Sequence, residues 1–318
     1  PNYGSALIQR LTLAGESFLT EPPVGFTTAP LLQERGFLMM GTNAQLAMRD
    51  EYESPSRAAD LETRRLTSSE LCELVPVLRP DAADWALLDP NAWDIDVEAL
   101  LQGYLRGARA HGARTLNSRE VTSVERAGSS WRIRGPELDV QADVIVNAAG
   151  AWADELAAHA GLAPLGLVPH RRTAFIFDPP EGTAVSGWPL VTDAGAQFYF
   201  KPDAGRLLGS LSEEVPVPAG DAQPEDLDVA IAVDRIEQVV NFPVRRVLRS
   251  WAGLRVFGPD RDPVSGFEPA APGFYWHAGL GGYGIQTAPA LGAFAAATIL
   301  GKAVPEDLVE RGVNVAQP

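Results

Sequence analysis

The sequence predicts an α/β protein in which an incomplete Rossmann-like domain is interleaved with a second domain built on a mixed or antiparallel sheet. Two patterns favour this fold class. The run ADVIVNAAG (142–150) has the form of a strand buried on both faces that turns at Gly150 into a helix, as in nucleotide-binding α/β sheets. From about residue 166, the pattern changes to short alternating stretches typical of antiparallel strands.

Helices and strands are expected in the following order. The first half is predicted to hold helices at 5–19, 68–78, 94–111 and 152–160, with strands at 36–40, 115–116, 121–125, 131–135 and 142–147. The 94–111 helix has aspartates at its start and arginines toward its end, which suits the helix dipole. The second half is predicted to hold strands at 166–178, 196–201, 206–212, 248–257 and 273–279, with helices at 224–240 and 287–300.

Two domains are expected, each formed from two parts of the chain. Residues 90–160 and 245–318 would form the Rossmann-like domain, and residues 1–89 and 161–244 the domain that faces the substrate. A doubly wound sheet that binds a dinucleotide usually opens with a strand, a G-x-G-x-x-G turn and a helix. That pattern does not occur in this sequence, so the first domain is predicted to lack its N-terminal βαβ start.

Composition narrows the function classes. The formal net charge of −15 argues against nucleic-acid binding, which needs clustered Lys and Arg. The single cysteine cannot form an internal disulfide, and the four histidines show no metal-ligand spacing. No apolar run reaches the length of a membrane span, and the N-terminus has no signal-peptide layout. We therefore expect a cytoplasmic protein without a metal.

Five ordered motifs resemble one enzyme family. The segments VIVNAAGAWADELA (144–157) and GFYWHAGLGGYGIQTAPALG (273–292) together resemble the signature of the D-amino-acid-oxidase superfamily of flavoenzymes. Between them, HRRTAFIF (170–177), FYFKPDAGRLLGS (198–210) and SWAGLRVF (250–257) resemble the bacterial D-arginine dehydrogenases of that superfamily. The resemblance implies FAD as cofactor and a D-amino acid as small-molecule partner. It leaves the electron acceptor, O2 or a quinone, open.

The same resemblance locates what this sequence lacks. In the family, the segment before Tyr3 carries the dinucleotide fingerprint, so the missing segment is itself an expected partner for FAD binding. Cys72 lies in a predicted helix far from the C-terminal glycine loop. Because a covalent flavin link in related enzymes uses a cysteine near that loop, the FAD is expected to be non-covalent.

The resemblance assigns substrate contacts to Tyr3, Arg172, Tyr199 and Arg255. A substrate carboxylate in a dry pocket needs a paired cation, and the fork of an arginine makes two parallel hydrogen bonds to it. Alternation along a strand places Arg171 and Arg172 on opposite faces, and the resemblance selects Arg172. A tyrosine can bond the carboxylate and wall the pocket. The alternatives are that the arginines pair with surface acids and that Tyr199 is an ordinary inward-facing aromatic.

The flavin is expected to contact two glycine-containing turns and one strand. Backbone N–H groups and a helix dipole would face the electron-rich end of the flavin ring. The residues concerned are Gly281, Gly282, Tyr283, Gly284, Ile285 and Gln286, with Gln286 also counted among the catalytic residues. Ala148, Ala149 and Gly150 are expected beside the flavin nucleotide, and the backbone of Val121 beside the adenine. The alternative for the first set is a turn that only reverses the chain.

Phe37 bears on which substrate side chain is preferred. The resemblance implies that the arginine-preferring enzymes have a glutamate at this position, which would form an ion pair with a cationic substrate side chain. A phenyl ring cannot form that ion pair. Neutral or apolar D-amino acids are therefore expected over D-arginine, unless Phe37 simply packs in the core. The expected reaction is oxidative deamination, with hydride transfer from Cα to flavin N5 and hydrolysis of the imino acid to a 2-oxo acid and ammonia.

Two other functions stay open. One is oxidation of a secondary amine, as in sarcosine or glycine oxidases, whose substrates also carry a carboxylate. The other is a non-catalytic fragment or subunit that needs the missing FAD-binding segment. No side chain in the sequence stands out as a general base.

Overall fold

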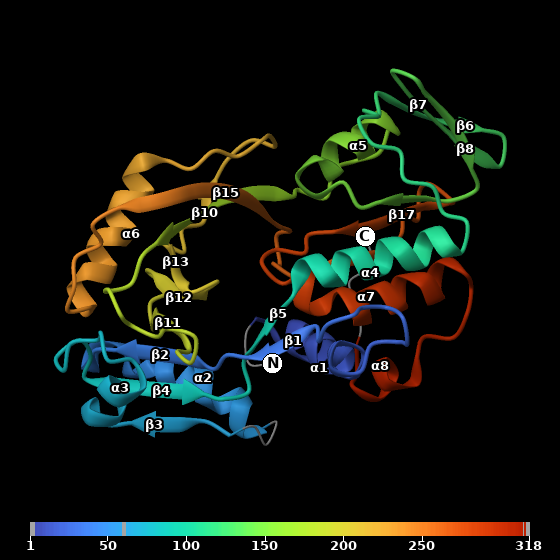
Figure 1. The fold of residues 1–318 in the computed structure, drawn as a ribbon. Helices are drawn as coiled ribbons and strands as arrows, with labels where there is room; N and C mark the ends of the chain where they lie inside the picture. The colour runs from blue at the N-terminus through green and yellow to red at the C-terminus, as the bar shows by residue number, and fades with distance from the viewer. Residues whose placement is uncertain (1–3, 59–61, 314, 316–318) are drawn as a thin grey trace.

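The computed structural model describes residues 4–58, 62–313 and 315, which form two lobes joined by a pair of long strands (Figure 1). Tyr3, an expected substrate residue, lies outside the described residues. The helices are α1 (Ala6–Thr20), α2 (Leu46–Ala58), α3 (Ser68–Leu74), α4 (Val97–Ala110), α5 (Ala153–His159), α6 (Asp226–Val239), α7 (Gly284–Ile299) and α8 (Glu306–Glu310), with short 3-10 turns η1 (Asn43–Gln45) and η2 (Gly150–Trp152).

One lobe is built on a nine-stranded mixed sheet. Its strands pair antiparallel except for β11 and β2, which run parallel. In spatial order they are β15 (Val247–Phe257), β10 (Val168–Phe177), β13 (Arg206–Ser210), β12 (Tyr199–Asp203), β11 (Leu190–Asp193), β2 (Phe37–Gly41), β4 (Trp85–Asp89) and β3 (Arg64–Leu66). Strand β14 (Val215–Pro216) pairs with the same edge of β10 as β13 does. The mixed, mainly antiparallel sheet expected from the alternating stretches is confirmed.

The main core covers one face of this sheet. Leu38, Val191, Phe200 and Phe175 are all almost fully buried, and the strand register puts them on the same face. They pack with residues of α3 and α6. We call this the back face, and the opposite one the front face. Because side chains alternate along a strand, the residues between these positions project from the front face.

The second lobe contains a three-stranded sheet in the order β16 (Val264–Phe267), β17 (Phe274–Ala278) and β9 (Ile145–Asn147). The strands β17 and β9 are parallel, as expected for a Rossmann-like unit. A second small sheet is formed by β6 (Ser123–Ala127), β7 (Ser130–Gly135) and β8 (Leu138–Ala142), and β1 (Leu32–Glu34) pairs with β5 (Trp93–Ile95).

The strand β9 is shorter and less buried than its apolar sequence suggested. It is three residues long, and Val146 is 44% exposed, so the expectation of burial on both faces is wrong at this residue. The reason is that, within the described ranges, β9 pairs only with β17 and its other edge carries no strand. Residues 115–116, expected as a strand, also belong to none.

The expected domain division differs from the structure at two elements. Helix α1 packs its apolar side on α7, with Leu11 and Ala14 in one buried cluster with Ala290 and Phe294. It therefore lies with the α7 lobe rather than with the large sheet (Figure 1). Strand β15, placed in the Rossmann-like domain, is instead a full partner of β10 in the large sheet.

Local sequence explains where several helices begin and end. Ser5 caps α1 by accepting from the N–H of Ile8, and Asp96 caps α4 by accepting from the N–H of Ala99. Thr67 and Glu70 form a reciprocal capping box on α3. That helix ends at Leu74, before the expected residue 78, because Pro76 disfavours helical backbone at the residue before it.

Within the part of the chain that the structure describes, no helix combines the length and apolar character needed to cross a membrane. The same residues contain no cluster of three or more His, Cys, Asp or Glu side chains that could hold a metal ion.

Candidate functional site

The front face of the large sheet carries the expected substrate residues that the structure describes. Phe37 pairs with Leu190 across β2 and β11, and Tyr199 pairs with Ser210 across β12 and β13. Both positions are one residue out of step with the buried back-face residues, so both project forward. Four strands of the sheet thus bring Phe37, Tyr199, Arg172 and Arg255 to one face.

Arg171 and Arg172 point to opposite faces. Arg171 lies on the back face, where its guanidinium pairs with Asp228 at 2.7 Å and with Glu225 at 2.9 Å at the start of α6. Arg172 is opposite Gly253 on β15, on the front face. The alternation that separated the two arginines in the sequence is therefore what the structure shows, and only Arg172 can serve a front-face site.

Arg255 lies on the same face of the β10–β15 pair as Arg172, because it is opposite His170, two residues before Arg172. Among the described residues its guanidinium has no ion-pair partner, although the side chain is partly buried. A Cβ added to Gly282 would lie 3.6 Å from Arg255 Cδ and Nε. The arginine is thus free, and it packs directly on the glycine loop before α7.

The loop before α7 is hydrogen-bonded to β15, and its glycines allow the backbone to pack closely against that strand. The N–H of Gly281 donates to the carbonyl of Val256 at 2.8 Å. Gly281 has φ +53°, and a Cβ there would lie 2.3 Å from Phe257 Cε1, so the loop requires glycine at this position. No side chain caps α7, whose first-turn N–H groups therefore remain available to a ligand.

The second expected turn lies at the same edge as this loop. Because β9 and β17 are parallel, the turn Ala148–Gly150 and the 279–284 loop both follow carboxyl ends of strands, where α/β sheets bind ligands. Buried Asn147 braces the turn: its Nδ2 donates to the carbonyl of Ala153, and its Oδ1 accepts from the N–H of Ala149. Asn147 was not among the site residues predicted from the sequence.

Three expected site residues have structural contacts of their own. The Gln286 side chain donates to Thr12 Oγ1 on α1 at 2.8 Å, so its amide joins two helices, and only its backbone N–H belongs to the open first turn of α7. The Phe37 ring stacks on Tyr52, with 5.4 Å between ring centroids. Val121 packs against the cluster around Trp131.

A small hydrogen-bonded cluster lies on the strands just before the loop. His277 is on β17, just before the loop, and its Nδ1 lies 3.3 Å from Ser265 Oγ, which also contacts Tyr275 Oη at 2.8 Å. Burial lowers the pKa of His277 below its ordinary value of 6.5, so the neutral ring is favoured in the folded protein.

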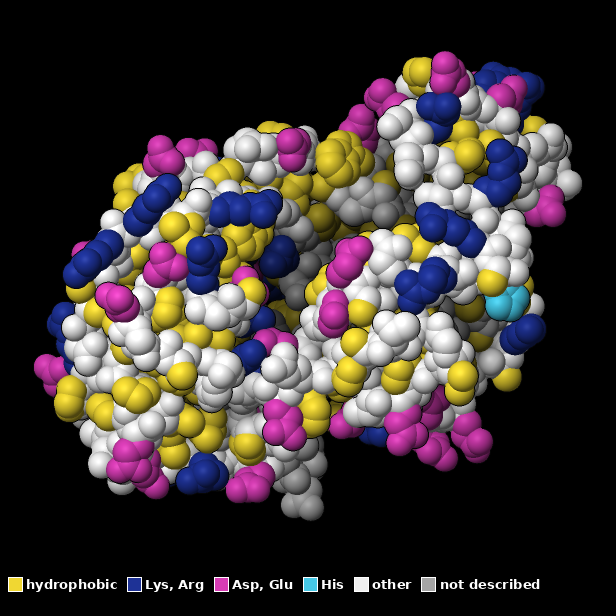
Figure 2. All heavy atoms as spheres, in the orientation of Figure 1, with side chains coloured by type: hydrophobic (Ala, Val, Ile, Leu, Met, Phe, Trp, Pro, Cys, Tyr) yellow, Lys and Arg dark blue, Asp and Glu magenta, His cyan; other side chains and the backbone are white. Residues whose placement is uncertain are grey.

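The two lobes leave a hollow between them, and Figure 2 shows Lys and Arg side chains along its wall. The contact between Arg255 on the sheet and Gly282 in the α7 lobe places the arginine where the lobes meet. A substrate carried on the front face would therefore lie next to the glycine loop.

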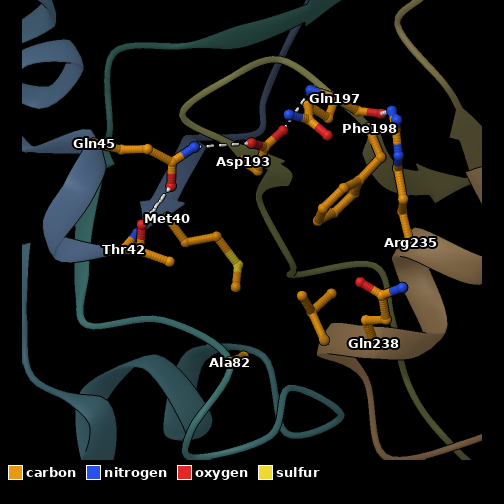
Figure 3. Close-up of a pocket in the computed structure, with 11 residues that line it drawn as sticks. Met40, Thr42, Gln45, Ala82, Asp193, Gln197, Phe198, Arg235 and Gln238 are labelled. Atoms are coloured by element: carbon orange, nitrogen blue, oxygen red, sulfur yellow. Dashed lines mark hydrogen bonds between the residues drawn. The ribbon is translucent and has the colours of Figure 1, made fainter.

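A separate pocket of about 200 Å³ lies at another end of the sheet (Figure 3). Gln45 Nε2 donates to Asp193 Oδ2 at 3.3 Å on one side of it, and Arg235 Nη1 donates to the carbonyl of Gln197 at 2.8 Å on the other. Its lining includes Met40, which belongs to the back-face core. This pocket is therefore not part of the front-face site.

The family profile described as FAD dependent oxidoreductase (DAO) matches residues 20–298. This chain belongs to that family. Solved structures of other proteins support the fold: glycine oxidase from Geobacillus kaustophilus superposes with a TM-score of 0.82 at 23% identity, covering 98% of this chain and 84% of that one. The L-alpha-glycerophosphate oxidase of Mycoplasma pneumoniae, with FAD bound, superposes with a TM-score of 0.80 at 17% identity, covering 94% and 81%.

Similar sequences include an uncharacterized oxidoreductase and dehydrogenases named for different substrates. The uncharacterized oxidoreductase YurR of Bacillus subtilis is 28% identical over 77% of this chain and 64% of its own length. Glycerol-3-phosphate dehydrogenase 1 of Mycobacterium tuberculosis is 29% identical over 61% of this chain and 38% of its own length. Mitochondrial dimethylglycine dehydrogenase of Mus musculus is 28% identical over 76% of this chain and 30% of its own length. The chain thus spans less than two thirds of each of these relatives.

FAD is the cofactor of this family, as the sequence motifs implied. The residues present fit the flavin end of FAD: glycines that permit close approach, uncapped N–H groups at the start of α7, and a neighbouring cation in Arg255. The residues that would hold it here are Gly281, Gly282 and Gly284, with the Ala148–Gly150 turn toward its nucleotide.

Sequence reasoning missed two acidic residues beside Arg172. Glu213 and Glu214 sit in the loop between β13 and β14, and both contact the Arg172 guanidinium. Their only signal in the sequence is that two acids follow the strand expected at 206–212.

Proposed function

We propose that this protein oxidises the Cα–N bond of amino acids, with D-amino acids of neutral or apolar side chain as its substrates. The observation that carries the proposal is Arg255, a partly buried guanidinium that has no ion-pair partner among the described residues and packs on the glycine loop of a FAD dependent oxidoreductase. An arginine left without a partner in such a position calls for an anionic ligand, and its geometry suits a carboxylate.

The front-face residues would act together on the substrate. Arg255 and Arg172 hold the carboxylate from two strands, which fixes Cα relative to the loop before α7. Tyr199 lies on the same face of the sheet, on β12, where its ring would form a wall of the substrate site. When bound, FAD supplies the acceptor for the hydride that leaves Cα. The released imino acid then hydrolyses to a 2-oxo acid and ammonia.

The preference for an uncharged side chain is supported by Phe37. Its half-buried ring, stacked on Tyr52, presents carbon atoms to the front face and carries no charge that could form an ion pair with a cationic group. The D configuration is supported by the five ordered motifs, which resemble enzymes that act on D-amino acids.

A second candidate is oxidation of a secondary or tertiary amine that carries a carboxylate. The relative named dimethylglycine dehydrogenase and the structural neighbour named glycine oxidase favour it. The arginine pair serves both candidates, because both substrates present a carboxylate.

A substrate panel with the FAD-reconstituted protein separates the two. We expect reduction of a dye acceptor with D-leucine and D-phenylalanine, and little with their L enantiomers or with sarcosine. Turnover confined to sarcosine and dimethylglycine would support the second candidate. A protein that takes up no FAD, seen as the absence of the flavin absorbance band after reconstitution, would contradict catalysis by this chain.

The role of Arg255 is tested by Arg255→Ala. Loss of the clamp leaves the substrate carboxylate half-paired, which costs about 3 kcal/mol, or about two decades in kcat/KM. The control is Arg249→Ala, because Arg249 is on the same strand and the same face but six residues further from the loop. A loss below about fivefold in Arg255→Ala would show that this arginine does not bind the carboxylate.

A further inference from the structure

Residues 211–214 interrupt the pairing along β10. The strands β13 and β14 both pair with β10, but β13 ends at Ser210 and β14 begins at Val215. Between them Ser212 adopts a positive φ of 60°, and the chain leaves the sheet. The N–H of Thr173, which faces this gap, donates to the Glu213 carboxylate instead of to a strand carbonyl.

This segment also holds the Arg172 guanidinium. Arg172 Nε donates to the carbonyl of Glu213 at 2.8 Å, and Nη2 lies 3.3 Å from Glu214 Oε1. The Nε–Nη2 edge of an arginine is one of the edges with which it makes two parallel bonds to a carboxylate. On Arg172 that edge is already bonded within the protein, whereas Arg255 has no such partner in the described part of the chain.

Glu214 has a second partner on the other side. Its Oε2 lies 2.7 Å from Arg261 Nη2, a shorter contact than the one to Arg172. The Arg261 guanidinium is itself placed 3.8 Å over the ring of Phe257, next to the glycine loop. Glu214 is 37% exposed, so its carboxylate has room to leave Arg172 while Arg261 still holds it.

We propose that Glu214 competes with the substrate for Arg172. The Glu214 carboxylate pairs with Arg172 when the site is empty, and it keeps its ion pair with Arg261 but leaves Arg172 when a substrate carboxylate binds. The inference rests on the proposed function, since it takes Arg172 as a ligand of that carboxylate. It assigns Glu214 and Arg261 to the control of substrate affinity.

Two substitutions with opposite expected effects test this exchange. Glu214→Gln keeps the shape and removes the competing charge, so KM for the amino acid should fall about threefold with kcat nearly unchanged. Arg261→Met removes the second ion pair of Glu214 and leaves the one to Arg172, so KM should rise by about the same factor. Binding of benzoate, a carboxylate without an amine, should follow the same order in titration calorimetry.

The control is Glu225→Gln, which alters the corresponding pair of Arg171 on the back face and should leave KM unchanged. An unchanged or raised KM in a stable Glu214→Gln protein, with weaker benzoate binding, would show that Glu214 only braces Arg172 and would overturn the proposal. A wild-type protein inactive on every amine in the panel would defeat the proposed function instead, and the benzoate series would still decide the role of Glu214.

Discussion

At the scale of single residues, Phe37 gives a prediction about substrate choice. Its ring stacks on Tyr52, and its Cα partner on β4 is Asp89, which is almost fully buried. Phe37→Glu would supply an ion-pair partner to a cationic substrate side chain, so kcat/KM for D-arginine relative to D-leucine should rise about tenfold. Steady-state assays on the two substrates measure this ratio.

The same substitution has a structural cost that must be controlled. A glutamate at position 37 would lie directly opposite Asp89, and like charges opposite each other destabilise a sheet. Phe37→Gln has the shape without the charge, so it separates loss of the ring from gain of the carboxylate. Equal substrate ratios in the Glu and Gln variants would mean that the substrate side chain does not reach Phe37.

The surroundings of a single residue can be predicted from the sequence where a local rule decides the geometry. The alternation of side chains along a strand was enough to place Arg171 and Arg172 on opposite faces. Such prediction fails where the contacting residue is far away along the chain. The contact between Gln286 and Thr12 joins residues 274 positions apart, and Glu214 meets Arg172 only because a break in the sheet brings it there. Neither contact leaves a periodic pattern in the sequence.

At the scale of elements, the loop before α7 gives a second prediction. Gly281→Ala would place a Cβ 2.3 Å from a ring carbon of Phe257, at a φ of +53° that side chains rarely adopt. The loop must then shift away from β15, so the protein should retain much less flavin. The ratio of flavin absorbance to protein absorbance after desalting measures the loss.

A control glycine lies in helix α7, which follows the loop. Gly292 has no atom within 4 Å of an added Cβ, so Gly292→Ala should keep its flavin and gain up to about 1 kcal/mol of stability from helix propensity. Full flavin retention in Gly281→Ala would show that this backbone does not form the flavin contact.

Helices that have a clear pattern in their own sequence could be predicted. Helices α1, α4 and α6 carry an apolar stripe, and α1 and α4 also have a capping side chain; all three lie close to the expected ranges. Strand β4 was missed because WALLD lies inside the sheet and is buried at four of five positions, which removes the alternation. Helix α2 was missed because it is mostly polar and contains Pro55.

At the scale of the whole molecule, the site depends on one strand pair. Strands β10 and β15 belong to the large sheet, yet the end of β15 is bonded to the glycine loop of the other lobe. Shifting this pair by one residue would turn Arg172 and Arg255 to the back face. The sequence division at residue 245 missed this arrangement, because an alternating strand does not reveal which sheet it joins.

The last prediction concerns the stability of the whole protein against pH. Burial lowers the pKa of His277 below 6.5, so the folded protein favours the neutral ring and the unfolded chain takes up the proton first. The stabilisation is fully present above pH 6.5 and is lost as the pH falls through the folded-state value. Urea unfolding between about pH 7.5 and about pH 5 should therefore show a falling free energy of unfolding, and His277→Gln should flatten that fall. His159→Gln, on the exposed surface of α5, is the control and should keep the wild-type slope. If the His277→Gln protein loses stability with acid as steeply as the wild type, other groups cause the loss and His277 is not held neutral by the fold.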